Sequence, residues 1–354
     1  MEKLRQGITT GTCAAAAAKA ALSLMCGDKI NGEVEIPMPD GSRRMIPVKK
    51  AAISENSATA TVIKDSGDDP DVTNGMEVVV TADWADDQGD IIFNAGEGVG
   101  TVTRRGLQIP PGEPAINPAP REMITTAVKE VTKRSVRITI SIPGGEKVAE
   151  KTFNPRLGVE GGLSILGTTG IVRPYSHSAI IATLRCSLDV LLATGERNLI
   201  FTGGNIGTKT ALQELGVGKD RVVEVSNEWG EMLDYAKDKD IDSALILGHP
   251  GKLAKLTTGY FDTHSSKSPS AVPIILALAK KTGIKAPEDA NTAEEIFTTI
   301  SPKSITKLAQ KLAMGVTEAA SKRVDGKFEI SCALINMKNE IIGHHDDLTK
   351  WKNQ

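Results

Sequence analysis

The sequence predicts two domains: an N-terminal α+β domain with a mainly antiparallel sheet, and a C-terminal three-layer, Rossmann-like α/β domain with a mostly parallel sheet. The chain has 354 residues, more than one ordinary domain needs. Up to residue 153, strand-length runs alternate apolar and polar residues, which is typical of a half-buried antiparallel sheet. Beyond it, short apolar runs alternate with helical patterns, which indicates a parallel sheet covered on both faces. We place the boundary near Pro155, giving domains 1–153 and 154–354.

The N-terminal domain is predicted to begin with a helix. The run Thr9–Thr12 offers hydroxyl caps to a helix that begins near Cys13 and ends before Gly27. The alanines inside this helix indicate close packing against a sheet. The strands predicted after it are Glu33–Ile36, Arg44–Val48, Ser57–Ile63, Met76–Thr81 and Asp90–Phe93, followed by a helix at Arg121–Lys133 and a strand at Ser135–Ile142.

The C-terminal domain is predicted as strands that are each followed by a helix. A short strand at Leu163–Leu166 and a helix at Ser176–Ala193 come first. The strand–helix pairs are Leu199–Thr202 with Lys209–Leu215, Arg221–Val225 with Trp229–Lys237, and Ala244–Leu247 with Lys252–Leu256. The last predicted elements are the helices Pro269–Lys281 and Lys303–Ala320 and a hairpin of Phe328–Asn336 with Glu340–Gly343.

Composition excludes several classes of function. The net charge of −2 gives no global attraction to nucleic acid, and 3% aromatic residues leave few platforms for base stacking. No stretch is long and apolar enough to span a bilayer. The four cysteines lack metal-binding spacing, which is typical of reduced thiols in a cytoplasmic protein. A site for an anion must therefore be a local cluster of Arg and Lys.

The segment Asn94–Arg121 is a long loop rich in Gly and Pro that also carries arginines, so we interpret it as a shaped wall of a binding site. Its start, Ile91–Gly100, matches the strand and GxGxG turn of nucleotide and adenosylmethionine sites, but no helix follows. Cofactor contact, substrate contact and a purely structural turn all remain open. Arginines here and at Arg156 fit a substrate with several carboxylates or phosphates.

The segment Lys64–Asp71 groups four carboxylates. An EF-hand is excluded, because counting from Asp69 puts Asn74 and Val80 where Gly and Glu are needed. One interpretation is a solvated turn. The other is a carboxylate, Asp68 or Asp69, that takes a proton or holds ribose hydroxyls or a sulfonium.

Two Gly-rich turns follow predicted strands of the second domain. Phe201–Thr210 is one residue away from a Walker A loop, which makes ATP hydrolysis a poor prediction, but such turns still present backbone N–H groups to ligands. In Leu247–Lys255, two lysines share one helix face, where an anion would offset their charge. Nearby His249, Asp262 and His264 allow three interpretations: a metal triad, proton transfer by an Asp-oriented His, or a hydrogen-bonded loop histidine.

These blocks together resemble the cobalt-precorrin-5B C1-methyltransferase family of anaerobic cobalamin biosynthesis. The resemblance covers nearly the whole chain, in order. The matching blocks are Gly7–Ala16, Lys64–Thr73, Gly96–Gly100, Gly112–Pro118, Asn154–Gly158, Ile165–Gly170, Gly248–Lys252 and Asp262–Ser265. In one departure from the common methyltransferase fold, Asp90–Phe93 lacks an acidic end.

The resemblance implies methyl transfer from S-adenosylmethionine to C1 of a cobalt-bound tetrapyrrole, giving cobalt-precorrin-6A. Cobalt would arrive with the substrate, so no protein metal site is expected; other enzymes of the pathway and a second copy of the chain are the further partners it allows. The catalytic candidates are Asp68, Asp69 and His264. The cofactor candidates are Gly203, Gly204, Asn205, Gly207, Gly248 and His249. The substrate candidates are Thr10, Thr12, Glu97, Gly98, Arg104, Asn117, Arg121, Arg156, Lys252 and Lys255.

Two alternative functions remain open. The first is a nucleotide-dependent enzyme that uses the turn at Gly203–Gly207, and the second is a non-catalytic tetrapyrrole-binding protein. The missing helix after Gly100 makes Asn94–Arg121 a poor cradle for adenosine. We therefore expect that segment to face the carboxylate arms of the corrinoid as a rigid wall between the domains, and we expect the cofactor at a turn of the second domain.

Overall fold

The computed structural model describes residues 4–86 and 91–352 and divides the chain into two compact units, Met1–Ala179 and Ile180–Gln354. The division lies later than the predicted boundary near Pro155. The reason is that the segment beyond Pro155 pairs with strands of the first unit. Strand β10 (Val159–Glu160) pairs with β8 (Thr101–Val102), and β11 (Ile171–Val172) pairs with β1 (Gly7–Ile8).

The first unit contains a five-stranded sheet of order β4-β5-β6-β9-β7. All neighbours are antiparallel except β7 and β9, which are parallel. The mainly antiparallel sheet was predicted, whereas its edge strand β4 was not; Asp90, at the start of one predicted strand, lies outside the described residues. The strands are β4 (Lys50–Ile53), β5 (Ser57–Ile63), β6 (Glu77–Trp84), β7 (Ile91–Ala95) and β9 (Val136–Ser141).

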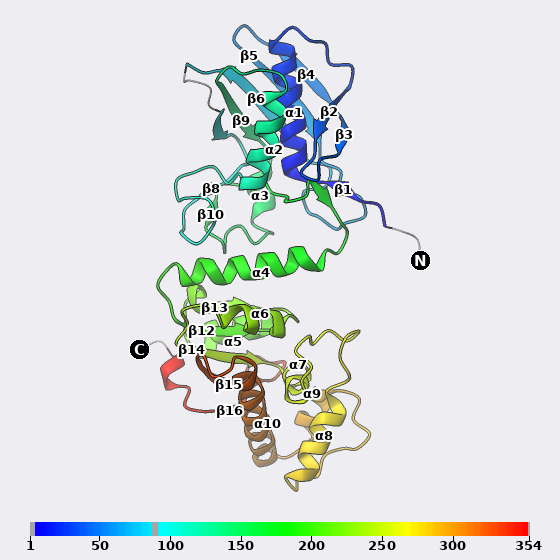
Figure 1. Ribbon diagram of the computed structural model, residues 1–354. Helices are drawn as coiled ribbons and strands as arrows, with labels where there is room; N and C mark the ends of the chain where they lie inside the picture. The colour runs from blue at the N-terminus through cyan, green and yellow to red at the C-terminus, as the bar shows by residue number, and fades with distance from the viewer. Residues whose placement is uncertain (1–3, 87–90, 353–354) are drawn as a thin grey trace. The chain divides into compact units, whose positions relative to one another are not determined.

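Helix α1 (Thr10–Met25) packs against this sheet and against α2 (Pro118–Lys129), as Figure 1 shows. Its alanines Ala14–Ala18 are fully buried. Small side chains let the helix approach its neighbours closely, so the alanine run reflects packing density. The remaining elements of this unit are the hairpin β2 (Glu33–Pro37) with β3 (Arg43–Pro47) and the short helix α3 (Gly145–Ala149).

The second unit contains a five-stranded sheet of order β13-β12-β14-β15-β16. Its strands are parallel except for β16, which closes the predicted hairpin with β15. Every residue of β14 is buried, as expected for a strand covered on both faces. The strands are β12 (Asn198–Thr202), β13 (Val222–Glu224), β14 (Ser243–Gly248), β15 (Glu329–Ile335) and β16 (Ile341–His345).

Helices cover both faces of this sheet (Figure 1). One face packs against α4 (His177–Leu192), α6 (Trp229–Ala236) and α10 (Pro302–Arg323), and the other against α5 (Asn205–Glu214) and the 3-10 turn η3 (Thr349–Trp351). No described helix is both long and apolar enough to cross a membrane. The remaining elements are η1 (Lys219–Arg221), α7 (Pro250–Leu253), η2 (Ala254–Thr258), α8 (Val272–Lys281) and α9 (Ala293–Thr299).

One predicted strand is wrong. The segment Leu163–Leu166 makes only isolated bridges, from Leu163 to Val99 and from Ile165 to Ile116. Leu163 and Ile165 are buried, and their backbones bridge to the Gly/Pro loop, whereas Leu166 is exposed; a short apolar run therefore does not indicate a strand here.

Candidate functional site

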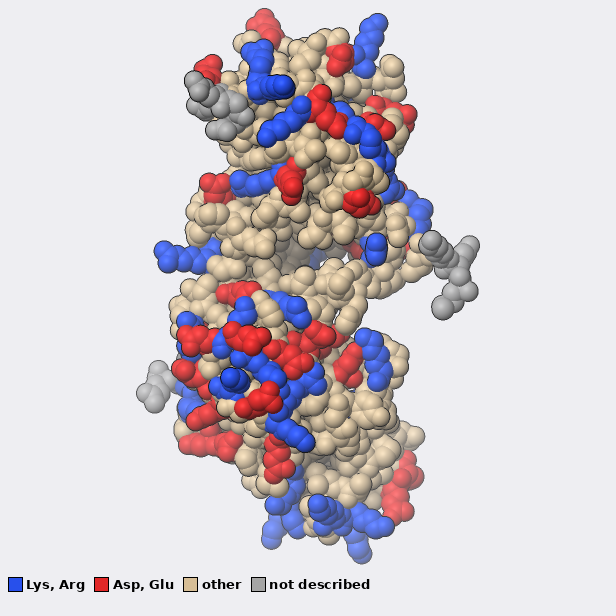
Figure 2. All heavy atoms as spheres, viewed as in Figure 1, with Lys and Arg blue, Asp and Glu red and all other residues tan. Residues whose placement is uncertain are grey.

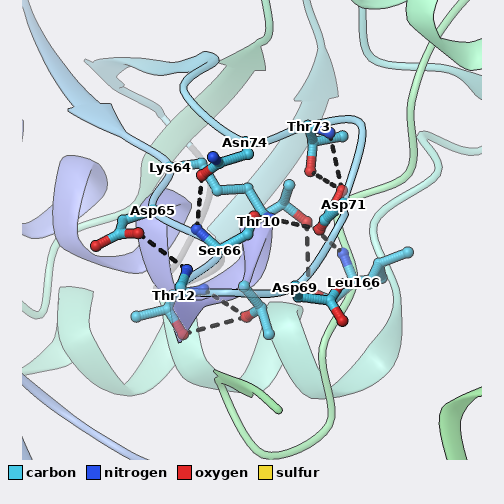
Figure 3. A network of polar contacts seen from close by, with 12 residues as sticks. Thr10, Thr12, Lys64, Asp65, Ser66, Asp69, Asp71, Thr73, Asn74 and Leu166 are labelled. Carbon is cyan, nitrogen blue, oxygen red and sulfur yellow. Dashed lines mark hydrogen bonds and ion pairs between the residues drawn. The ribbon is translucent and has the colours of Figure 1, made fainter. Parts of the chain in front are cut away.

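The N-terminus of α1 lies at a dense polar junction in the first unit (Figure 3). The Thr10 hydroxyl accepts a hydrogen bond from the Leu166 N–H at 2.9 Å, and the Thr12 hydroxyl donates to the Gly170 carbonyl at 2.6 Å. Both threonines are buried. The hydroxyls of Thr10 and Thr12, predicted as substrate contacts, satisfy backbone groups far away in the sequence.

The acidic loop of the same junction is held by a buried lysine (Figure 3). Lys64 is 2% exposed, and its Nζ donates to Asp71 Oδ2 at 2.5 Å and to Ser66 Oγ at 2.5 Å. Burial acts to raise the pKa of Asp71, but hydrogen bonds from Lys64 and Thr73 prevail and lower it. This part of the loop is thus a folded structure around an ion pair, and the solvated-turn interpretation does not hold for it.

The two predicted catalytic carboxylates of this loop each accept a backbone hydrogen bond. Asp68 is exposed, and its Oδ2 accepts from the Arg5 N–H at 2.5 Å. Asp69 is half-buried, and its Oδ1 accepts from the N–H of Tyr175 at 2.9 Å. Tyr175 has a φ of 55°, unusual for a bulky residue, so Asp69 stabilises a strained backbone.

In the Gly/Pro loop, Arg121, predicted as a substrate ligand, contacts its own loop. Its Nε donates to the Ile116 carbonyl at 2.9 Å and its Nη2 to Glu113 Oε2 at 3.2 Å. The guanidinium also lies over the ring of Phe93, 5.3 Å from the centroid. The arginine therefore stiffens the loop by joining its two ends.

Three further candidates of this loop differ in exposure. Gly98 is buried with a φ of 71°, and a Cβ there would collide with the Ile142 carbonyl, so this glycine serves backbone packing. Glu97 is exposed. Asn117 is exposed at the N-cap of α2, and its side chain makes no capping bond. The last two side chains face solvent, where a ligand can reach them.

Two predicted substrate arginines lie near one another. The side chain of Arg104 packs directly against Gly158, two residues from Arg156, and the Thr103 hydroxyl donates to the Gly158 carbonyl at 3.0 Å. Arg104, Arg105 and Arg156 are exposed. The pairing of β8 with β10 thus gathers positive charge on one part of the first unit. Elsewhere, basic and acidic side chains are interspersed over most of the face in Figure 2.

In the second unit, the two Gly-rich turns meet at the carboxyl edge of the parallel sheet. Strands β12 and β14 are neighbours, and the Nζ of Lys252, in the turn after β14, donates to the carbonyl of Gly203, after β12, at 2.9 Å. Gly204 has φ 137° and ψ −165°, a conformation that essentially only glycine adopts. Asn205 begins α5 and is exposed. The structure therefore brings these predicted residues together.

Gly207 and Gly248 act in packing. A Cβ on Gly207 would lie 2.9 Å from Thr202 Cβ and 3.0 Å from the Leu247 carbonyl oxygen, so glycine lets α5 pack closely on the sheet. Gly248 is buried against Leu253. Gly207 and Gly248 are buried, whereas Gly203 and Gly204 are half-buried, so a ligand can reach the backbone of the second pair more readily.

One acidic residue at this edge was missed from the sequence. Glu224 ends β13, and its Oε1 accepts a hydrogen bond from the Thr208 hydroxyl at 2.8 Å. The strand order reverses here, because β13 lies on one side of β12 and β14 on the other. An acid about 20 residues after a glycine turn holds ribose hydroxyls in dinucleotide-binding folds, so the spacing from Gly204 was the available signal.

Histidines near this edge are occupied by local contacts. His249 is the N-cap of α7, and its Nδ1 accepts from the Gly251 N–H at 3.0 Å. The proton is therefore on Nε2, which contacts Glu294 Oε2 at 2.8 Å. His264 is exposed, with its Nδ1 2.7 Å from Ser266 Oγ. Among the described residues, the ligand atoms of His249, Asp262 and His264 do not form a metal-binding group.

Comparisons with known proteins give consistent names. The family model described as CbiD matches residues 1–174, and the CbiD C-terminal domain matches residues 262–346. A cobalt-precorrin-5B C(1)-methyltransferase of Syntrophotalea carbinolica is 45% identical over 99% of this chain and 100% of its own. One from Methanocaldococcus jannaschii is 44% identical over 97% of both chains. The crystal structure of the cobalamin biosynthesis protein cbiD from Archaeoglobus fulgidus is 29% identical, covers 79% of this chain and 85% of that chain, and superposes with a TM-score of 0.39.

Proposed function

The chain belongs to the CbiD family, and we propose that it transfers a methyl group from S-adenosylmethionine to carbon C1 of cobalt-precorrin-5B, giving cobalt-precorrin-6A. The names of relatives more than 40% identical along nearly their whole length support the reaction. Cobalt enters as part of the substrate. The new bond joins C1 to the methyl carbon, while the carbon–sulfur bond breaks and its electron pair stays on sulfur as adenosylhomocysteine forms.

The methyl donor is assigned to the carboxyl edge of the sheet in the second unit. In this Rossmann-like arrangement, ligands bind where the strand order reverses. The observation that carries the assignment is the coincidence, at that point, of the bare backbone at Gly203–Gly204 with the carboxylate of Glu224. Glycine lets an adenosine approach the backbone, and a carboxylate at the end of the next strand accepts hydrogen bonds from ribose hydroxyls.

The corrinoid is assigned to the exposed arginines of the first unit. Its acetate and propionate arms match Arg104, Arg105 and Arg156, whose guanidinium groups bind carboxylates through paired hydrogen bonds. Methyl transfer to carbon needs alignment more than covalent help from the protein, so fixing the macrocycle is the main catalytic task. Asp68, Asp69 and His264 remain the candidates for taking up a proton as the ring electrons reorganise.

Replacement of Glu224 by Gln tests the donor site. Loss of a charged hydrogen-bond acceptor should weaken adenosylhomocysteine binding roughly 10-fold by calorimetry. The matched control is Glu214→Gln, on the exposed end of α5. Transfer of labelled methyl from adenosylmethionine to cobalt-precorrin-5B by the wild type tests the reaction itself.

The binding measurement tests the donor site, and the labelling experiment tests the reaction, so each can contradict its own hypothesis without the other. Equal affinity of the Glu224 and Glu214 variants for adenosylhomocysteine would remove the donor from this edge without touching the reaction. A folded wild-type protein that leaves the corrinoid unlabelled would reject the methyltransferase and favour a tetrapyrrole-binding protein.

A further inference from the structure

Two lysines at the carboxyl edge of the second unit have only uncharged hydrogen-bond acceptors among the described residues. Lys255 is only 6% exposed, and its Nζ donates to the Thr263 carbonyl and to Ser268 Oγ, both at 3.0 Å. Lys252 is half-buried, and its Nζ donates to the Gly203 carbonyl. All three acceptors are uncharged. Within the described ranges, neither ammonium forms an ion pair with a carboxylate.

This arrangement is electrostatically unfavourable for the protein alone. Removing an ammonium from water is costly, and a carbonyl or hydroxyl oxygen offsets less of that cost than a carboxylate does. Burial lowers the pKa of Lys252, and the positive charge of Lys255 lowers it further. Elsewhere in the chain the buried lysine, Lys64, has Asp71 as its partner. The lysine pair therefore differs from a structural ion pair by lacking its anion.

The surroundings of Lys252 add a second, independent observation. A Cβ on Gly203 would lie 3.3 Å from Trp229 Cζ2 and 3.4 Å from Lys252 Cδ, so the indole ring and the lysine stem flank the bare backbone of this turn. Trp229 is fully buried, and its Nε1–H has no hydrogen-bond acceptor among the described residues. A buried donor without an acceptor is rare in native proteins. Among the described residues, the Lys252 ammonium beside this turn therefore lacks an acidic partner, and the Trp229 indole N–H lacks any acceptor.

We propose that Lys252, with the charge of Lys255 behind it, binds a carboxylate group of a ligand at the turn after β12. This inference rests on the proposed function, which supplies two sources of that group. One is the amino-acid end of adenosylmethionine, whose adenosine is assigned to the same turn. The other is an acetate or propionate arm of the corrinoid. A carboxylate neutralises the pair and accepts hydrogen bonds from the two remaining N–H groups of Lys252.

Calorimetry with matched probes separates the sources. Adenosylhomocysteine carries the amino-acid carboxylate, whereas methylthioadenosine lacks it. Cobyrinic acid carries free carboxylate arms, whereas its heptamethyl ester has none. The variant is Lys252→Gln, and the control is Lys209→Gln, an exposed lysine of α5 that loses the same charge.

If the donor supplies the carboxylate, Lys252→Gln should bind adenosylhomocysteine roughly 10-fold more weakly, as expected for one charged hydrogen bond, and methylthioadenosine unchanged. If the corrinoid supplies it, cobyrinic acid should lose affinity while its ester and adenosylhomocysteine do not. Lys252→Arg, which keeps the charge, should retain most of the affinity in either case and guards against misfolding of the glutamine variant.

Unchanged affinity of Lys252→Gln for both acids overturns the proposal. So does an equal loss for methylthioadenosine and adenosylhomocysteine, because that pattern indicates a damaged pocket. Failure of the proposed donor site looks different: the wild type then binds neither adenosine compound, or Glu224→Gln binds both as tightly as wild type does.

Discussion

Replacement of Asp71 by Asn tests whether the junction at the N-terminus of α1 depends on its ion pair. The change leaves the ammonium of Lys64, 2% exposed, with the Ser66 hydroxyl and a neutral amide. Removing one partner of a buried pair costs about 3–5 kcal/mol. Water reaches the Asp71 side chain, which is 25% exposed, so we expect the lower end, about 3 kcal/mol.

Native-state hydrogen exchange of the first unit measures this loss locally. A destabilisation of about 3 kcal/mol should speed exchange of the most protected amides in β5 and β6 roughly 100-fold. The control, Asp68→Asn, alters an exposed carboxylate of the same loop and should change these rates less than about 5-fold. Lys64→Met should cost less than Asp71→Asn, because Asp71 can turn to water. Equal protection in the Asp71 and Asp68 variants would refute the role of the ion pair.

Two further predictions concern packing and pH. Gly207→Ala should destabilise the second unit by about 1–3 kcal/mol in urea unfolding, because its Cβ would press on Thr202 and Leu247; a loss below about 0.5 kcal/mol would contradict close packing of α5. Hydrogen bonds from Arg43 and Lys19 lower the pKa of Glu130 from 4.5 to about 2. The stabilisation that ionised Glu130 contributes is therefore fully present above pH 4.5 and is lost as the pH falls toward 2. The urea midpoints of wild type and Glu130→Gln should converge over that window. A constant difference between them would contradict the lowered pKa of Glu130.

Much of the fold could be predicted because its long elements carry local signals. Thr9 caps α1, its Oγ1 accepting the Thr12 N–H at 3.2 Å, and β14 is a continuous apolar run that is buried along its length. The division after Ala179 could not be predicted, because it depends on the distant pairing of β10 and β11 with β8 and β1. The strand predicted at Leu163–Leu166 is wrong for a related reason: the segment makes only isolated bridges, to the distant residues Val99 and Ile116.

The site was harder to predict than the fold. Nothing local distinguishes a hydroxyl that binds a ligand from one that binds the chain's own backbone, so the backbone partners of Thr10 and Thr12 could not be predicted. The partners of Arg121 on the Gly/Pro loop could not be predicted either, since they are set by the folded path of that loop. Glu224, by contrast, lay within reach of sequence reasoning. The run Asp90–Phe93 lacks an acidic end in the sequence, whereas Glu224, the acid that we propose for the donor site, follows the glycine turn of the other unit.

Whether a basic side chain has a carboxylate partner distinguishes structural cations from candidate ligand-binding cations better than its sequence motif does. Lys64 forms an ion pair with Asp71, and Arg43 forms one with Glu130. The positive charge of each is therefore neutralised within the protein. Lys252 and Lys255 lie in a Gly-rich segment as well, and within the part of the chain that the structure describes their hydrogen-bond partners are all neutral. Because a buried charge without a counter-ion is costly, the carboxylate ligand proposed for this pair would offset that cost. On this criterion the proposed carboxylate site, at the strand reversal beside Glu224, is where binding of a ligand would be coupled most directly to the electrostatics of the second unit.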